Sequence, residues 1–269
     1  MIIDYLGNSL INSPRKISVW EQMSLEHPEF TPAHDLFDDH EQVATLLLGN
    51  YIGFTPFTGA RVMDIGANAG ILTAYWAIHG ADVTAYEADP VTHKLLTNML
   101  TKNSLKANVI HAAVWTHTGE VLYAGHGNQW DDRGGRNGAI QVPIHDGFVG
   151  NLGSETDTVT VPCISLVDAL GDVIWDAVKI DIEGAEFELL MSVEDQVLRD
   201  RIRYMHLEFH NDWADDALYH KLMDKLASIF DLDIFPNPHV GYPWHGRTDW
   251  ARCTNKHVNV EREMRDINS

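Results

Sequence analysis

Two short segments of the chain place polar residues directly after strand-like apolar runs, where they could hold a ligand or move a proton. In the first, VMDIGANAG at residues 62–70, Asp64 is followed by a glycine-rich turn and then by an apolar helix. In the second, KIDIEGAE at residues 179–186, a cluster of carboxylates ends another apolar run. Open α/β sheets bind ligands at the carboxyl ends of their parallel strands. We therefore expect one pocket that holds a cofactor and a reacting group side by side.

The glycine-rich turn favours a cationic cofactor over a dinucleotide. A dinucleotide fingerprint would read G-x-G-x-x-G, whereas the turn here reads G-x-N-x-G. Glycines let the backbone approach a ligand, and the N-terminus of the following helix offers free N–H groups. The carboxylate on the strand suits a cation better than a pyrophosphate, and S-adenosylmethionine carries an ammonium and a sulfonium. The residues expected to contact this cofactor at the turn are Asp64, Gly66, Asn68 and Gly70.

The second acidic residue of the expected cofactor site is Glu87, which ends the strand-like segment DVTAYE. A carboxylate at this place can accept hydrogen bonds from both ribose hydroxyls. The alternative is that Glu87 caps the next helix, but Asp89, followed by Pro90, already supplies an N-cap. We therefore expect Glu87 to bind the ribose.

Chemistry on the acceptor side is expected at the ends of two later strands. Asp181 ends one of them, while Glu208 and His210 end the other and point the same way because they are two residues apart. In one interpretation, Asp181 or His210 is a general base that removes the proton of a substrate hydroxyl. In the other, Asp181, Glu208 and His210 bind a divalent cation, Mg²⁺ or Mn²⁺, which lowers the pKa of that hydroxyl. Glu183 and Glu186 could serve only as favourable charges at the start of their helix.

Strands that alternate with helices are expected to position these residues. The pattern predicts helices at about 40–50, at 69–79, from Pro90, from Ala185 and up to Phe230. The strands between them are RVMDI, DVTAYE, NVIHAAV, WDAVKIDI and RIRYMHLEF, with DLDIF and CTNKHVNVE near the C-terminus. Such alternation implies right-handed crossovers and a parallel sheet of about seven strands.

The alternation is interrupted at about residues 116–157, which we interpret as an inserted loop in a domain of residues 41–269, after an N-terminal extension at 1–40. TGEVLY and VTVPCIS are strand-like, and we expect the polar, glycine-rich stretch at 126–138 to be a mobile lid. Some aromatic residues could stack on a sugar or seal the edge of the core: Trp130, Tyr242, Trp244 and Trp250. The arginines that could pair with an acidic acceptor are Arg133, Arg136 and Arg247.

Taken together, these motifs resemble the class I S-adenosylmethionine-dependent methyltransferases and, more narrowly, the FkbM family. The matching segments occur in family order over about residues 41–210: VMDIGANAGILT, AYEADP, HAAVW, TGEVLY, VPCISLVDAL, DAVKIDIEGAEFELL and MHLEFH. The resemblance implies a doubly wound α/β fold with a seven-stranded, mostly parallel, Rossmann-like sheet. It also implies a cofactor site that includes Ala88 and Ala113, and O-methylation of a sugar, a glycan or a small secondary metabolite. Residues 1–40 and those after His210 match no motif, and we expect them to select the acceptor.

The composition limits the partners that the protein can have. Its 269 residues carry a net charge of −20, so no basic face for nucleic acid is expected. No apolar run approaches the roughly 20 residues that span a bilayer, and the N-terminus lacks the order of a secretory signal. Cys163 and Cys253 form no disulfide framework. We expect a cytoplasmic enzyme with a small-molecule or glycan acceptor; an NAD(P)-dependent oxidoreductase and a non-catalytic cofactor-binding protein are the alternatives.

Overall fold

The computed structural model describes residues 58–124, 158–210, 216–236 and 248–257, together with the backbone of three two-residue strands between residues 139 and 148. The N-terminal extension at 1–40, the helix expected at 40–50 and the lid expected at 126–138 lie outside the described residues. So do Trp130, Tyr242, Trp244 and the three arginines expected near the acceptor, Arg133, Arg136 and Arg247.

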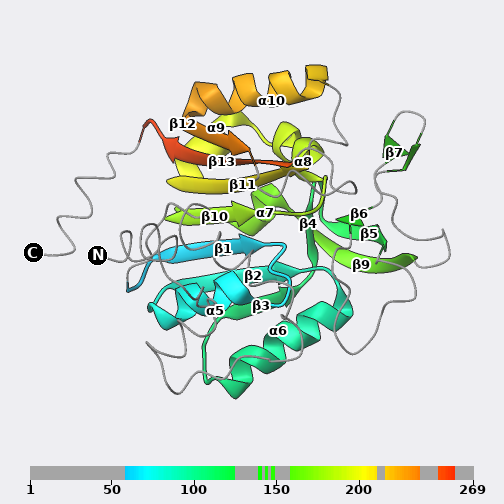
Figure 1. Ribbon diagram of the computed structural model, residues 1–269, viewed down its shortest axis with the longest axis vertical. Coiled ribbons are helices and arrows are strands. Elements are labelled where there is room, and N and C mark those ends of the chain that lie inside the picture. Colours follow the sequence, from blue (N-terminus) through cyan, green and yellow to red (C-terminus); the bar gives the residue numbers. More distant parts are fainter. Residues whose placement is uncertain are drawn as a thin grey trace, which may run out of the picture.

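A seven-stranded sheet forms the centre of the molecule (Figure 1). In spatial order its strands are β12 (Phe230–Pro236), β13 (Thr248–Asn255), β11 (Tyr204–His210), β10 (Ala177–Ile180), β1 (Arg61–Ile65), β2 (Asp82–Glu87) and β3 (Asn108–His111). The strands from β11 to β3 pair in parallel, and β13 is antiparallel to both of its neighbours. The predicted mostly parallel, seven-stranded α/β fold is therefore confirmed.

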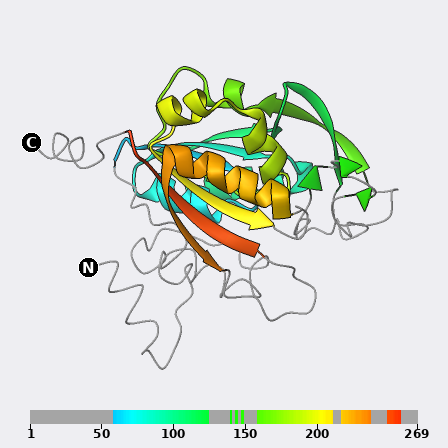
Figure 2. The same cartoon turned by 90° about the horizontal axis from the view of Figure 1, so that it is seen from above.

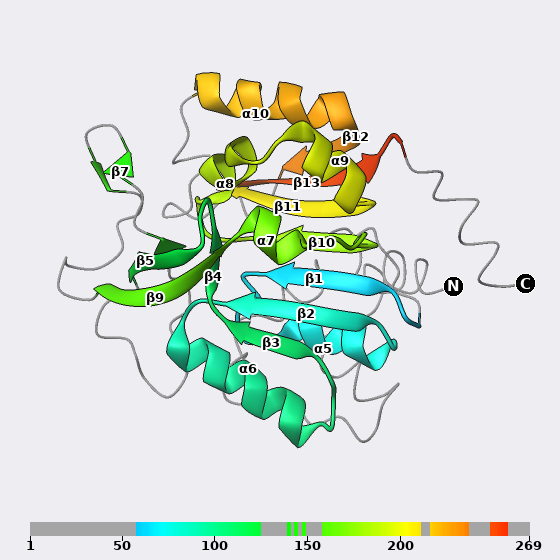
Figure 3. The ribbon, with the colours of Figure 1, turned by 180° about the vertical axis from the view of Figure 1, so that it is seen from behind.

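Helices cover both faces of this sheet, as a doubly wound fold requires (Figure 3). On one face are α5 (Ile71–Ile78) and α6 (Pro90–Lys102), which pack on apolar side chains of β1 and β2. The other face carries α7 (Leu166–Leu170), α8 (Glu186–Ser192), α9 (Asp195–Arg201) and α10 (Asp216–Ile229). Successive residues of a strand point to opposite faces, so the apolar runs of the central strands fill both layers. No helix in the described part of the chain is long and apolar enough to cross a membrane.

A smaller sheet lies beyond the carboxyl ends of the central strands (Figure 2). Its strands, in spatial order, are β4 (Ala113–Trp115), β9 (Thr158–Ser165), β5 (Gly119–Ala124) and β6 (Ala139–Ile140), and a separate hairpin joins β7 (Pro143–Ile144) to β8 (Gly147–Phe148). Side chains of β4, β5 and β9 pack against Ala88, Ile182 and Ala185 in the turns after β2 and β10. The smaller sheet therefore forms a wall over the edge at which the expected site lies.

Three details of the sequence prediction are wrong. NVIHAAV is not one strand, because the chain breaks at Ala112 and β4 leaves the central sheet to pair with β9. The last strand begins at Thr248, five residues before the predicted segment, and α10 ends at Ile229, so that Phe230 begins β12. Of the two roles considered for Trp250, the structure shows that of sealing the core: Trp250 is 4% exposed and packs with the core residues under α5.

Candidate active site

The glycine-rich turn joins β1 to α5 and is tied to the neighbouring strand β2. The backbone N–H groups of Gly66 and Ala67 both donate to the carbonyl of Tyr86, at 3.1 and 3.0 Å. Gly66 has φ +74°, and a Cβ there would lie 1.9 Å from the carbonyl oxygen of Asp181. Only glycine fits here, because the turn after β1 touches the backbone that follows β10. The two halves of the expected site are thus in direct contact.

The second glycine of the turn also faces protein. Gly70 has φ +87°, and a Cβ there would lie 2.0 Å from Cδ1 of Leu96 on α6. The sequence interpretation gave both glycines a close approach to a ligand, whereas the structure gives each of them a close protein neighbour. Asn68, exposed and with φ 51°, lies between them, and its side chain accepts a hydrogen bond from Ala69 N at 2.7 Å. Contact of this turn with the cofactor remains a prediction.

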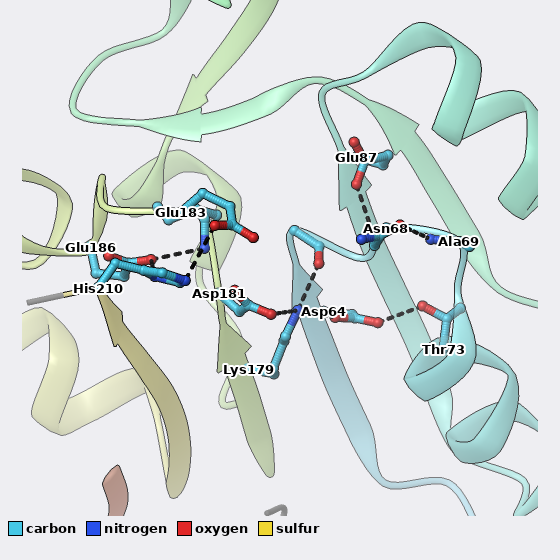
Figure 4. Close-up of polar contacts among 12 residues, drawn as sticks. Asp64, Asn68, Ala69, Thr73, Glu87, Lys179, Asp181, Glu183, Glu186 and His210 are labelled. Atoms are coloured by element: carbon cyan, nitrogen blue, oxygen red, sulfur yellow. Dashed lines mark hydrogen bonds and ion pairs between the residues drawn. The ribbon is translucent and has the colours of Figure 1, made fainter. Parts of the chain in front are cut away.

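Glu87 is held at the end of β2 by two backbone groups. Its Oε2 accepts from Asn68 N at 2.7 Å (Figure 4), and its Oε1 accepts from Asp89 N at 2.8 Å. Asp89 caps α6 by accepting from the N–H groups of Val91 and Thr92, as expected, so Glu87 is not needed as a cap. Burial raises the pKa of Glu87 to about 7 even though the two N–H donors lower it. Each oxygen keeps room for one more donor, which suits the expected ribose hydroxyls.

Asp64 lies at the expected place but is fully buried and already has partners. Its Oδ2 accepts from the hydroxyl of Thr73 at 2.6 Å, and Nζ of Lys179 lies 3.6 Å from its Oδ1. Burial raises the pKa of Asp64 by more than Lys179 and Thr73 lower it. Oδ1 is fully buried, and the ammonium of Lys179 lies beside it. Binding of a cofactor ammonium by Asp64 remains a prediction.

Lys179 joins Asp64 to the acceptor side and was not singled out by the sequence analysis. Its Nζ donates to the Gly66 carbonyl at 2.6 Å and lies 3.3 Å from Oδ2 of Asp181. Burial lowers the pKa of this amine, but Asp181 and Asp64 outweigh that effect and raise it to about 12. Lys179 therefore stays a cation at any working pH. A lysine inside the buried strand AVKI was the available signal, because a buried charge must have partners.

The acceptor-side residues come from the turn after β10 and from the end of β11. Ligand atoms of Asp181, Glu183 and His210 lie within 4.8 Å of one another. Glu183, which the predicted set did not include, belongs to this group because its left-handed turn (φ 56°) brings it close. Glu208, two residues before the end of β11, lies outside this group of ligand atoms, but its carboxylate raises the pKa values of Lys179, Glu183 and His210, so its part in the site stays a prediction.

Glu186 orients His210 and shapes the turn before it. Glu186 is fully buried, and it accepts from Ile182 N and Gly184 N, both at 3.0 Å. Nδ1 of His210 lies 3.0 Å from Oε1 of Glu186, and Nε2 lies 3.3 Å from Oε2 of Glu183. Glu186 thus supports the site from within. The sequence analysis had considered it only as a favourable charge at the start of its helix.

The carboxylates beside His210 favour the charged form of its imidazole. Burial alone would lower the pKa of His210, but Glu183 and Glu186 outweigh it and raise that pKa well above 6.5. An imidazolium donates from both of its nitrogens and accepts no proton. Of the two bases considered from the sequence, Asp181 is therefore the better candidate.

The small sheet supplies the remaining wall of the site. Ala113, at the start of β4, is buried in the same apolar cluster that Ala88 contacts, and His111 Nε2 lies 3.0 Å from the Ala88 carbonyl oxygen. The buried Tyr123 was missed by the sequence analysis. Burial raises its pKa well above 10, and the carboxylates of Glu87, Asp89 and Glu183 raise it further. Its phenol therefore lies near both the cofactor acid and the acceptor acids; nothing in its local sequence indicated this.

Comparison with known proteins defines the class of this site. The methyltransferase FkbM domain matches residues 64–236, which include every described residue of the site. The chain belongs to this family and is an S-adenosylmethionine-dependent methyltransferase.

Several solved structures are similar to this chain at low sequence identity. The human methyltransferase 10 domain containing protein is 14% identical, over 75% of this chain and 73% of that one, with a TM-score of 0.43. An rRNA methylase from Streptococcus thermophilus is 9% identical, over 74% and 89% of the two chains, with a TM-score of 0.42. Precorrin-6y C5,15-methyltransferase from Geobacter metallireducens is 13% identical, over 85% and 96%, with a TM-score of 0.42. Among curated proteins no match was found.

Proposed function

We propose that this protein transfers the methyl group of S-adenosylmethionine to a hydroxyl oxygen of a small molecule or glycan. The observation that carries the proposal is the contact between the two halves of the site, where Gly66 touches the backbone of Asp181. Methyl transfer needs the acceptor oxygen in line with the breaking sulfur–carbon bond. An acceptor held at Asp181 would lie beside a cofactor held at the turn after β1.

The residues fit the cofactor in their chemistry. Glu87 has two carboxylate oxygens, each of which can accept a further hydrogen bond from a ribose hydroxyl. Ala88 and Ala113 are small, so a flat base can approach the wall that they form. When bound, the cofactor supplies an electrophilic methyl group and leaves as a neutral thioether. We expect a micromolar dissociation constant, which corresponds to a binding free energy on the order of −7 to −8 kcal/mol.

Asp181 is the residue proposed to handle the proton. As the acceptor oxygen bonds to the methyl carbon, its proton passes to a carboxylate oxygen of Asp181. Lys179 beside Asp181 compensates that carboxylate's charge, and the imidazolium of His210 faces the other carboxylates of the cluster. A base placed in this way typically accelerates transfer by roughly 10²–10⁴.

The competing version is a divalent cation bound by Asp181, Glu183 and His210. Two carboxylates and an imidazole suit Mn²⁺ better than Mg²⁺, which prefers oxygen ligands alone. The base version is favoured because Nζ of Lys179, 3.3 Å from Oδ2 of Asp181, already compensates the charge of that carboxylate. Chelator treatment decides between them. If Asp181 acts as a base, turnover should not change. Two results would instead establish the metal. Chelation would abolish activity and Mn²⁺ would restore it, and Mn²⁺ alone would raise Tm in the unaltered protein but not in Glu183→Gln.

Asp181→Asn tests the proposal, because it keeps the shape of the side chain and removes its charge. With an acceptor found by screening, turnover should fall by at least about 10², while calorimetry shows little change in S-adenosylhomocysteine affinity. Asp172→Asn is the control, since Asp172 is exposed and pairs only at the surface with Arg201. Near-normal turnover in Asp181→Asn would reject the proposed acceptor site. Binding of NAD in place of S-adenosylmethionine would favour an oxidoreductase.

A further inference from the structure

Lys179 is a buried cation that contacts both halves of the site (Figure 4). It lies beside Asp64 in the register of β1 and β10, so its side chain points to the same face of the sheet. From there Nζ reaches three oxygens: the Gly66 carbonyl at 2.6 Å, Oδ2 of Asp181 at 3.3 Å and Oδ1 of Asp64 at 3.6 Å. The first and last belong to the strand and turn expected to hold the cofactor, and the second belongs to the acceptor side.

These contacts differ from those of an ordinary internal ion pair. A pair between two strands would be complete with Asp64, whose carboxylate is fully buried. Lys179 instead makes its shortest contact with a backbone carbonyl of the glycine turn and shares its charge with Asp181, whose side chain is 25% exposed. Because a side chain at the rim of the site would otherwise sample several rotamers, the amine restricts where the Asp181 carboxylate can lie.

We propose that Lys179 is a positioning residue that fixes the Asp181 carboxylate relative to the cofactor turn, and thereby sets the distance over which the methyl group is transferred. The inference rests on the proposed placement of the acceptor at Asp181. It adds that an acceptor hydroxyl is bound in line only while the amine holds Gly66, Asp64 and Asp181 together. A misplacement of the order of 1 Å can cost about 10²-fold in rate.

The test compares Lys179→Met, which keeps the length of the side chain without its charge, with a matched control. Arg203→Met removes an ion pair with Asp176 (2.5 Å) at the opposite ends of the same two strands, β10 and β11. Lys179→Met should lower kcat by about 10² with a much smaller change in S-adenosylhomocysteine affinity. Arg203→Met should lower Tm and leave kcat unchanged. An unchanged kcat in folded Lys179→Met overturns the inference.

A double variant separates a positioning role from a merely structural one. If Lys179 acts through Asp181, then adding Lys179→Met to Asp181→Asn lowers kcat little further, whereas independent effects multiply. Multiplying losses would overturn the inference while leaving the proposed function intact. Normal turnover in Asp181→Asn alone would reject both. If Lys179→Met fails to fold, Lys179→Arg and Lys179→Gln replace it. Lys179→Arg keeps the positive charge and should keep most of the turnover that Lys179→Gln loses. Equal turnover in these two variants would overturn the inference.

Hydrogen exchange gives a readout that needs no acceptor. Loss of the amine should raise exchange at residues 66–70 and at 181–184 together, because one group holds both turns. In Arg203→Met both turns should keep their protection. Unchanged protection of either turn in Lys179→Met would show that Lys179 does not link them, and would overturn the inference without touching the proposed reaction.

Discussion

Glu87 is a cofactor-side residue whose charge state changes within the range of ordinary assay conditions. Burial raises its pKa from 4.5 to about 7, so the ionised form is disfavoured in the folded protein. The folded state binds the proton more tightly than the unfolded state, and therefore stability falls as the pH rises from about 4.5 to 7. The cost is absent below that window, and above it reaches about 3 kcal/mol. Ribose hydroxyls that donate to the ionised carboxylate would recover part of this cost.

Cofactor affinity should therefore depend on pH through Glu87. About a tenth of Glu87 is ionised at pH 6 and about nine tenths at pH 8, and only the ionised form accepts two hydroxyl donors. The Kd for S-adenosylhomocysteine should be about tenfold weaker at pH 6 than at pH 8, measured by calorimetry. Glu87→Gln should bind S-adenosylhomocysteine more weakly, and its Kd should be the same at pH 6 and pH 8. Equal affinity at the two pH values in the unaltered protein would remove the ribose assignment.

Single residues were predictable where their position in a strand decided their place. Asp64, Glu87 and Asp181 could be assigned to one edge of the sheet because each follows an apolar run in a parallel pattern. The bridge made by Lys179 could not be predicted, since it depends on the cross-strand register of β1 and β10. The approach of Glu183 to His210 depends on a left-handed turn that glutamate rarely adopts. No sequence pattern encodes that conformation.

At the scale of elements, the glycine turn fixes the distance between β1, β10 and α6. Gly66→Ala places a Cβ at positive φ and within 1.9 Å of the Asp181 carbonyl oxygen. The backbone cost of about 1–2 kcal/mol and the overpacking cost of about 1–3 kcal/mol should add. The free energy of unfolding in urea should fall by about 2–5 kcal/mol.

Gly59→Ala is the matched control for the glycine substitution. Gly59 has φ +83° and would have nothing within 4 Å of its Cβ, so this variant carries the backbone cost without the clash. It should lose only about 1–2 kcal/mol and bind S-adenosylhomocysteine normally. If the two variants lose equal stability, the contact between the halves of the site is looser than the structure indicates.

The cap of α6 should be separable from the cofactor site. Asp89→Ala removes the side-chain acceptor for Val91 N and Thr92 N, which should cost about 1 kcal/mol in urea unfolding. The backbone N–H of Asp89, which donates to Glu87, is retained. Cofactor affinity should therefore stay close to normal, and Asp89→Asn should keep most of the cap. A large loss of cofactor affinity in Asp89→Ala would assign its side chain to the cofactor site.

Elements were predictable where apolar periodicity was long and bounded. RVMDI, DVTAYE and the helix capped by Asp89 appear within a residue or two of expectation. The division of NVIHAAV was not predictable, because both halves are apolar and the partner of its second half, β9, begins more than 40 residues later. Pairing over such separations is decided by tertiary packing rather than by local propensity.

At the scale of the whole molecule, the net charge of −20 opposes any polyanionic partner. A protein that binds RNA neutralises phosphates with lysine and arginine, and even sequence-independent binding needs several such contacts. This chain has 19 basic residues against 39 acidic ones. Several of the basic side chains in the described part are already paired with carboxylates, among them Lys179, Arg201, Arg203 and Lys225.

We therefore expect no measurable RNA binding, and we do not expect a nucleic acid to be the methyl acceptor. In fluorescence anisotropy at 150 mM salt, a labelled RNA hairpin should bind with a Kd no tighter than about 10⁻⁴ M. Lowering the salt concentration should not strengthen this binding, because the acidic protein and the RNA repel each other more strongly when their charges are less screened. The same chain with an added oligo-arginine tail is the control, since it should bind and show that the assay responds. Micromolar binding by the untagged protein, weakening as salt is raised, would mean that a basic face exists outside the described residues. The acceptor would then have to be sought among nucleic acids instead of sugars and small hydroxyl compounds.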